Sequence, residues 1–312
     1  MSDLRAQMQR DLQWLCDCPD LMMAESGTGT ATESGTGTGT GTGTESGTGT
    51  GTVLPSPTIP SLDDPLWGTV EAHLSHRESH RVSHRVSHRV GYYVETLLEV
   101  WLGTIPGVTE IRRGIQIQDG KTTRGELDFL FQQDGRLHHL EVALKFFLHQ
   151  PHAPGGSHES TSEFPGPNAR DNFEKKRDKI LNSQLPFGRS CFPEVSESRA
   201  LMKGMIFYHP QQTFATNLPE KMNPDHARGM WIRSTEWELI LQRFPSYSGC
   251  ILQKPFWLAE KTSLSPLPEL TAELQQHFSG SDSPVLLSLR LAKGNVETES
   301  IRLFVVSAAW PG

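Results

Sequence analysis

The stretch GELDFLFQQDGRLHHLEVALKFFL, residues 125–148, decides the fold of this chain. Apolar and polar residues alternate on both sides of Asp134-Gly135, a dipeptide typical of the tight turn between two antiparallel strands. The alternation places Asp128 on one face of the first strand, and it places Glu141 and Lys145 together on one face of the second. The pattern therefore predicts a hairpin in which Asp128 and Glu141 are near neighbours across the two strands.

These charged side chains would share one side of an otherwise apolar sheet. Burying them is costly unless they are paired or bind a cation. Carboxylate oxygens are the ligands that Mg²⁺ prefers, and Lys145 could orient a water molecule or neutralise charge on a reacting phosphate. A solvated salt bridge across the strands would give the same pattern, so the residues alone leave both interpretations open.

A helix is predicted immediately before these strands. In VGYYVETLLEVWL, residues 90–102, the apolar residues recur at the spacing of one helical face, and GTIPG then ends the helix. Glu95 and Glu99 lie one turn apart on this helix, and either could supply a further carboxylate if the helix packs beside the strands. EIRRGIQIQD, residues 110–119, alternates as the hairpin does, so residues 70–150 are expected to form a helix and three antiparallel strands.

A charged amphipathic helix is expected over residues 168–185, NARDNFEKKRDKILNSQL. Asp171, Lys175, Lys179 and Gln184 could face the carboxylate site or a phosphate backbone, and a solvated outer face is the alternative for each. Further along, RALMKGMIFYH, SPVLLSLRLAK and ESIRLFVVSAAWP are strand-like, and GMWIRSTEWELILQRF predicts a strand leading into a helix. The C-terminal half is therefore expected to extend the same domain.

Low-complexity sequence divides the chain. Residues 1–23 contain an amphipathic helix that we assign to the main domain. Residues 24–66 hold alternating Gly and Thr and then a Pro-rich run, which predict a disordered insertion because little apolar surface is present to offset the entropy of ordering. Residues 67–312 are predicted to form the main domain, with a core at about 88–210 and a C-terminal extension.

A second repeat, SHRESHRVSHRVSHRV at residues 75–90, places a histidine at every fourth position. On a helix these histidines would line one stripe. We interpret the repeat as an exposed, expanded extension of the helix that follows. Adventitious metal binding and contact with nucleic-acid phosphates are the alternatives.

The overall composition narrows the class of protein. A net charge of -7 excludes a globally basic nucleic-acid binder but allows a local basic surface. The four cysteines lack the spacing of a zinc site. The N-terminus does not have the pattern of a signal peptide, and no apolar run approaches the ~20 residues of a membrane span, so a cytoplasmic protein without a membrane partner is expected. No phosphate-binding glycine loop or serine-hydrolase motif is evident.

The order of a helix glutamate, a strand aspartate and a strand carrying glutamate and lysine resembles the PD-(D/E)XK, or restriction-endonuclease-like, nuclease superfamily. RDLQWL, GYYVETLLEVWL, GELDFLF, LEVALKFFL, GPNARDNFEKK and KGMIFYH resemble more closely the bacterial DUF1853 family, over most of the chain outside the two repeats. This resemblance implies an α/β fold: a restriction-endonuclease-like central mixed sheet flanked by helices, with a C-terminal α+β extension.

The resemblance also implies roles for particular residues. Glu95, Asp128 and Glu141 would bind Mg²⁺ or Mn²⁺, and Lys145 would be the catalytic lysine. The superfamily pattern has its lysine two residues after the second acid, where this chain has Ala143. Lys145 lies on the same face, ~6 to 7 Å further along the strand.

Helix residues after the strands are further candidates. A helix glutamine near the site recurs in the superfamily, so Gln184 is a possible accessory residue, with Lys175 and Lys179 beside it. The function expected is that of a magnesium-dependent nuclease that hydrolyses the phosphodiester bonds of nucleic acid. The alternative is a non-catalytic nucleic-acid-binding or adaptor protein on the same scaffold. A protein-interaction module that uses the His/Arg helix is the third possibility.

Overall fold

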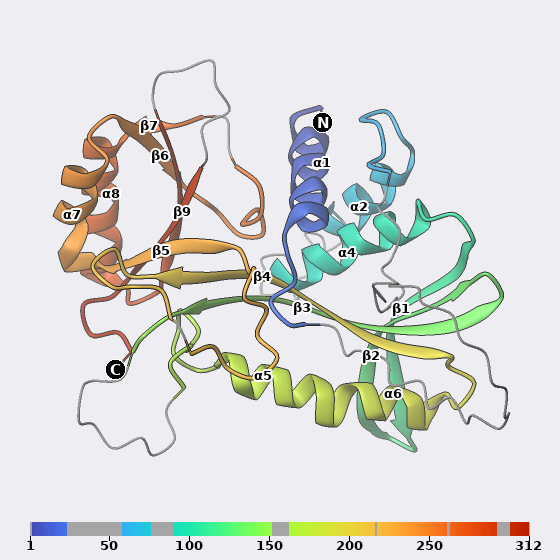
Figure 1. Ribbon diagram of the computed structural model, residues 1–312. Coiled ribbons are helices and arrows are strands. Elements are labelled where there is room, and N and C mark those ends of the chain that lie inside the picture. Colours follow the sequence, from blue (N-terminus) through green and yellow to red (C-terminus); the bar gives the residue numbers. More distant parts are fainter. Residues whose placement is uncertain are drawn as a thin grey trace, which may run out of the picture.

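A mixed sheet of nine strands runs through the described part of the chain in the order β1-β2-β3-β4-β5-β9-β8-β6-β7 (Figure 1). The computed structural model describes residues 2–23, 58–75, 90–151, 162–215, 217–260, 263–291 and 300–311. The strands are β1 (Val108–Asp119), β2 (Thr122–Gln133), β3 (Arg136–Leu148), β4 (Glu197–Tyr208), β5 (Arg228–Arg233), β6 (Tyr247–Ile251), β7 (Ser265–Pro266), β8 (Val285–Leu291) and β9 (Ile301–Val306).

Helices connect and cover these strands. The helices in the described ranges are α1 (Ser2–Asp17), α2 (Leu66–Ser75), α4 (Val90–Gly103), α5 (Phe173–Lys179), α6 (Leu185–Cys191), α7 (Trp237–Arg243) and α8 (Leu267–Gly280), with a π turn η1 (Ile180–Gln184) and a 3₁₀ turn η2 (Ser234–Glu236). No helix in these ranges is long and apolar enough to cross a membrane.

The first three strands form the predicted antiparallel meander, and this prediction is confirmed. Asp134 and Gly135 have φ values of 50° and 75°, and two successive positive φ values are what a tight hairpin turn requires. The sheet is mixed because β3, β4, β5 and β9 then pair in parallel, whereas β9, β8, β6 and β7 pair antiparallel.

Helices cover both faces of β1–β4 (Figure 1). The α1, α2 and α4 side chains pack on one face around Met8, Trp67 and Leu97, which are fully buried. On the other face, Phe173 of α5 and Ile180 of η1 pack against Phe147 of β3. The alternation along β3 produces this division, because successive side chains point to opposite faces of a strand.

The helix expected over residues 168–185 is displaced toward the C-terminus. Asn172 caps α5, since its side chain accepts a hydrogen bond from the backbone N–H of Lys175. The helix continues through the π turn and α6 to Cys191, past the predicted end. Residues 168–171 form a loop that precedes the cap.

The described strands of the C-terminal half all join the same sheet rather than forming a sheet of their own. β5, β8 and β9 occur where the apolar runs predicted them, whereas the sequence analysis did not identify α8. α7 and α8 pack on these strands around Ile240, Leu270 and Leu303. The Gly-Thr repeat and most of the SHR repeat fall in residues 24–57 and 76–89, outside the described residues.

A buried carboxylate ties the N-terminal helix to distant parts of the chain. Asp11 of α1 is 0% exposed. Its Oδ2 accepts a hydrogen bond from the hydroxyl of Tyr93 at 2.6 Å, and its Oδ1 accepts one from the backbone N–H of Ala259 at 2.6 Å. Burial raises the pKa of Asp11, and the positive charge of Arg302 opposes that shift. This carboxylate therefore joins α1 to α4 and to the segment between β6 and β7.

We predict that Asp11→Ala lowers the free energy of unfolding by about 3 kcal/mol or more, because it leaves two buried donors without an acceptor. Urea unfolding followed by circular dichroism would measure the loss. Asp17→Ala is the matched control, since Asp17 is exposed on the same helix and its loss is expected to cost about 0.5 kcal/mol or less. Equal losses in the two variants would contradict the role given to Asp11.

Candidate active site

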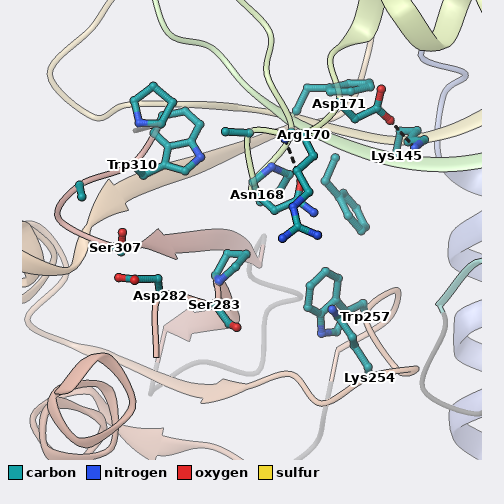
Figure 2. Close-up of a pocket in the computed structure, with 18 of the residues that line it drawn as sticks. Lys145, Asn168, Arg170, Asp171, Lys254, Trp257, Asp282, Ser283, Ser307 and Trp310 are labelled. Carbon is teal, nitrogen blue, oxygen red and sulfur yellow. Dashed lines mark hydrogen bonds and ion pairs between the residues drawn. The ribbon is translucent and has the colours of Figure 1, made fainter. Parts of the chain in front are cut away.

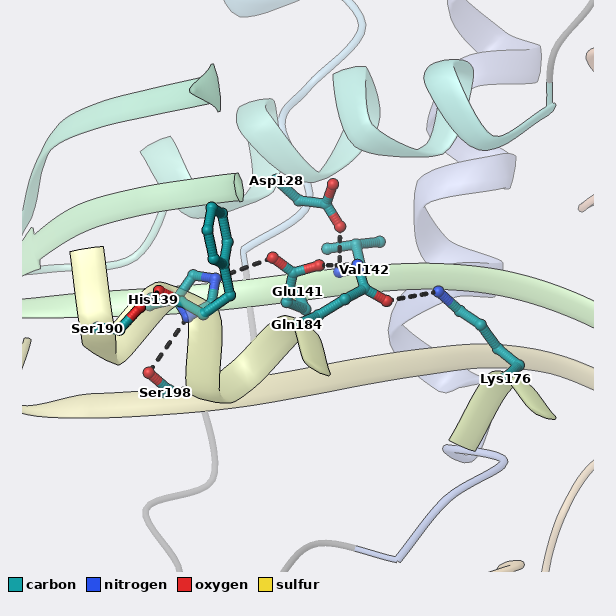
Figure 3. Close-up of polar contacts among 9 residues, drawn as sticks. Asp128, His139, Glu141, Val142, Lys176, Gln184, Ser190 and Ser198 are labelled. Atoms are coloured by element: carbon teal, nitrogen blue, oxygen red, sulfur yellow. Dashed lines mark hydrogen bonds and ion pairs between the residues drawn. The ribbon is translucent and has the colours of Figure 1, made fainter. Parts of the chain in front are cut away.

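The predicted carboxyl pair lies where β2 and β3 separate (Figure 3). The backbone ladder between these strands runs from Gln133 opposite Arg136 to Phe129 opposite Leu140, so the next position would set Asp128 against Glu141. There the backbone N–H of Val142 donates to Oδ2 of Asp128 at 2.7 Å. A side-chain carboxyl thus accepts from β3 at the point where backbone pairing ends.

Glu141 is held on both of its carboxylate oxygens. It is 1% exposed, and Nε2 of His139 lies 2.9 Å from its Oε1. The Gln184 side-chain amide donates to the other oxygen, Oε2. The other ring nitrogen of His139, Nδ1, lies 3.2 Å from the hydroxyl oxygen of Ser198 on β4. The imidazole is therefore fixed between β4 and the Glu141 carboxylate.

Burial and the neighbouring charge of Glu141 change the pKa of Asp128. Burial is the largest cause that raises the pKa of Asp128 to about 8, and the negative charge of Glu141 is the next. The charge of Glu95 and a hydrogen bond to Glu141 raise the pKa of Asp128 further. The hydrogen bond from the backbone N–H of Val142 lowers this pKa. Asp128 is therefore largely protonated at neutral pH, and the pair carries one negative charge rather than two.

Glu95 reaches this site electrostatically from α4, where its side chain is half-buried. Glu99, one turn further along, is instead paired with Arg113 at 3.1 Å. Within the described ranges, no three His, Cys, Asp or Glu side chains form a group that could hold a metal ion. The structure therefore brings Asp128 and Glu141 together, but it does not assemble the three-carboxylate group that the sequence analysis expected with Glu95.

The predicted lysine is engaged elsewhere. Nζ of Lys145 lies 2.5 Å from Oδ2 of Asp171, the residue just before the cap of α5. Both side chains are about one-third exposed. Lys145 was expected to act at the carboxyl pair. Its ammonium group is instead paired with Asp171, from a position on β3 four residues beyond Glu141.

A different lysine is connected to the pair. Nζ of Lys176 donates to Oε1 of Gln184 at 3.1 Å, and Gln184 in turn donates to Glu141 (Figure 3). Burial lowers the pKa of Lys176, the charges of Lys145 and Lys179 lower it further, and Asp128 and Glu141 act in the opposite direction.

Of the predicted helix residues, Gln184 contacts the carboxyl pair, while the side chains of Lys175 and Lys179 are exposed. Lys176 was not predicted as a site residue, since a regular helix was expected over these residues. Residues seven apart align over two turns of an α-helix, but the π turn adds one residue, so Lys176 and Gln184, eight apart, share a face. His139 was also missed; its place two residues before Glu141, on the same face of the strand, was the available signal.

Together these features define a mixed α/β protein whose central sheet carries a buried acidic pair supported by a histidine, a glutamine and a lysine. The chain belongs to the DUF1853 family, described as a domain of unknown function, and the family model matches residues 10–306. Comparisons with curated proteins and with solved structures give no match.

The raised pKa of Asp128 predicts a pH-dependent stability. The folded chain holds this proton more tightly than the unfolded chain, so the unfolded state binds fewer protons and stability falls as the pH rises from about 4 to about 8. Asp128→Asn mimics the protonated acid, so the stability of this variant should not fall as the pH rises. The difference in free energy of unfolding between Asp128→Asn and wild type is expected to grow by up to about 1.4 kcal/mol per pH unit between about pH 4 and pH 8. Above about pH 8 the difference is expected to level off.

Urea unfolding of both proteins in a chelator, between about pH 5 and pH 9, would measure this difference. Asp119→Asn, at the exposed β1–β2 turn, is the matched control and is expected to show no such trend. A difference between wild type and Asp128→Asn that does not change with pH would contradict the raised pKa.

Proposed function

We propose that this protein is a magnesium-dependent nuclease that hydrolyses the phosphodiester bonds of nucleic acid. The observation that carries the proposal is the Asp128–Glu141 pair, where burial, reinforced by the charge of Glu141, raises the pKa of Asp128 to about 8. Strongly perturbed carboxyl groups of this kind cluster at functional sites. The order of Glu95, Asp128 and Glu141 along one helix and two strands, which resembles the PD-(D/E)XK superfamily, supports the same function.

Asp128 and Glu141 fit Mg²⁺, because this ion commonly takes only one or two carboxylates from a protein and completes its shell with water and substrate phosphate. They are the residues that would hold it, with Glu95 as a further negative charge nearby. When bound, such an ion polarises a phosphoryl oxygen and lowers the pKa of a coordinated water. Asp128 must lose its proton for this role, so ion binding is expected to strengthen as the pH rises toward about 8.

The surrounding side chains have separate tasks. His139 and Gln184 fix the orientation of the Glu141 carboxylate through one bond to each oxygen. Lys176 contributes a cation close to both carboxyl groups and is itself positioned by Gln184. A preorganised cation of this kind stabilises the charge that develops on a phosphate during transfer.

A second candidate function is a non-catalytic nucleic-acid-binding or adaptor protein on the same scaffold. Two observations favour it: both oxygens of Glu141 are engaged by neighbouring side chains, and Ala143 stands where the superfamily has its lysine. In such a protein, the hydrogen bonds of His139 and Gln184 would serve to stabilise the sheet rather than to position a metal ligand.

Titration of Mn²⁺ into the purified protein by calorimetry tests the metal site without any assumption about the substrate. Wild type is expected to bind with an affinity that rises between about pH 6 and pH 8 and with release of protons. Asp128→Asn is expected to lose at least about tenfold in affinity, because it removes one of the two ligands.

Asp119→Asn controls for loss of surface charge and is expected to bind as wild type does. If wild type and Asp128→Asn bind Mn²⁺ equally, or if neither binds, the nuclease proposal fails and the non-catalytic function becomes the better one. Loss of binding in Asp128→Asn alone would justify a cleavage screen with DNA and RNA.

A further inference from the structure

A cavity of about 700 Å³ opens beside Lys145 of β3 and is lined by residues other than the carboxyl pair. Figure 2 shows the residues that line it. The cavity brings together residues 144–147 of β3, the loop 166–171, the loop that holds Lys254 and Trp257, residues 282–284, and the C-terminal segment around Trp310. Pockets of this size hold small ligands. Lys145 lies in its wall, four residues beyond Glu141 on the same face of β3, or about 13 Å along the strand.

The charged groups of the cavity favour an anion. Arg170 and Lys254 are exposed, and within the described part of the chain neither forms an ion pair. Figure 2 shows the Arg170 side chain extending toward Trp257. Lys145 is neutralised by Asp171, and Asp282 adds one acid. The lining therefore carries three cations and two carboxylates, a net charge of +1 in a chain whose net charge is -7.

Two indole rings supply the apolar part of the lining. Trp257 is half-buried, and Nζ of Lys254 lies 4.5 Å from its ring centroid. Trp310 is 7% exposed, and its buried indole Nε1 has no hydrogen-bond partner among the residues that the structure describes. A buried donor without an acceptor is unfavourable, so a ligand whose acceptor reaches Nε1 of Trp310 would bind more tightly.

We propose that this cavity binds a nucleotide unit, that is, an unpaired base together with its phosphate. The base stacks on Trp257 and the phosphate is bound by Arg170 and Lys254. Stacking of a base on an aromatic side chain contributes about 5- to 150-fold in affinity, more than the about 2- to 5-fold of an exposed cation–π contact, so the base can displace Lys254 from the ring. The displaced ammonium is then free to reach the phosphate.

This inference deepens the proposed function and rests on it for the link to hydrolysis. A base inside a duplex presents no free face to an indole ring, so the site selects single-stranded nucleic acid. The cavity lies within one or two nucleotides of the carboxyl pair along β3, which places the bound unit next to the phosphodiester bond that would be cut. A free mononucleotide has the same chemistry, and the experiment separates the two sources.

Fluorescence anisotropy with a labelled oligothymidylate of about twelve nucleotides, in a chelator that prevents cleavage, tests the proposal. Wild type is expected to bind. Trp257→Ala is expected to weaken binding by about 5- to 150-fold, and Trp257→Phe, which keeps an aromatic ring against Phe146 and Phe304, to weaken it much less. Arg170→Gln is expected to weaken binding. It should also reduce the slope of log K against log salt concentration by about 0.7 in magnitude, the contribution of one phosphate contact on a single strand.

Arg243→Gln is the matched control, because Arg243 is exposed on α7 and does not line the cavity. A duplex of the same sequence is expected to bind at least about tenfold more weakly than the single strand. If a free mononucleotide competes as strongly as the strand does, the cavity binds nucleotides as free molecules. If the strand competes far better, it is a subsite for nucleic acid.

Three results would overturn the inference: no binding of either ligand, equal binding of single strand and duplex, or full binding by folded Trp257→Ala and Arg170→Gln. The anisotropy assay contains a chelator, so binding at the cavity is measured without a metal ion at the carboxyl pair. Failure of the metal site in calorimetry and failure of the cavity in anisotropy are therefore separate outcomes.

Discussion

The close approach of two carboxyl groups between β2 and β3 is the constraint on which the rest of the site depends. Burial, reinforced by the charge of Glu141, raises the pKa of Asp128, so this carboxyl group keeps its proton near neutral pH. The neighbouring side chains compensate for the remaining charge. His139 and Gln184 each bind one oxygen of Glu141, and Lys176 adds a positive charge behind Gln184. A divalent cation would neutralise the negative charge of the carboxyl pair more completely than these hydrogen bonds do. The proposed metal-bound site would therefore use the same two carboxyl groups.

Much of this arrangement follows from local sequence patterns. The period of two along residues 125–148 predicted the hairpin and the proximity of Asp128 to Glu141, because a tight turn fixes the register of its strands. The apolar face of α4 likewise predicted the side of the helix that packs on the sheet, with the polar Glu95 beside it.

Other parts of the site could not be predicted in this way. Lys176 faces Gln184 only because a π turn interrupts the helix, and no local pattern marked that turn. The pairing of Lys145 with Asp171 depends on where the loop before α5 folds back onto β3. The cavity joins five segments spread over residues 144–311, so it exists only once the β5–β9 side of the sheet is in place.

The bonds of Asp11 have a consequence for how the chain reaches this structure during synthesis. Asp11 belongs to α1, which is synthesised before the sheet on which it packs, yet one of its donors, Ala259, follows 248 residues later. Until then, the buried position of this carboxylate cannot be completed, and α1 lacks one of the contacts that anchor it. Contacts of such long sequence separation are slow to form. α1 is therefore locked in place late, although it is made before the strands on which it packs, and a nascent chain that ends before residue 259 leaves that side of the domain open.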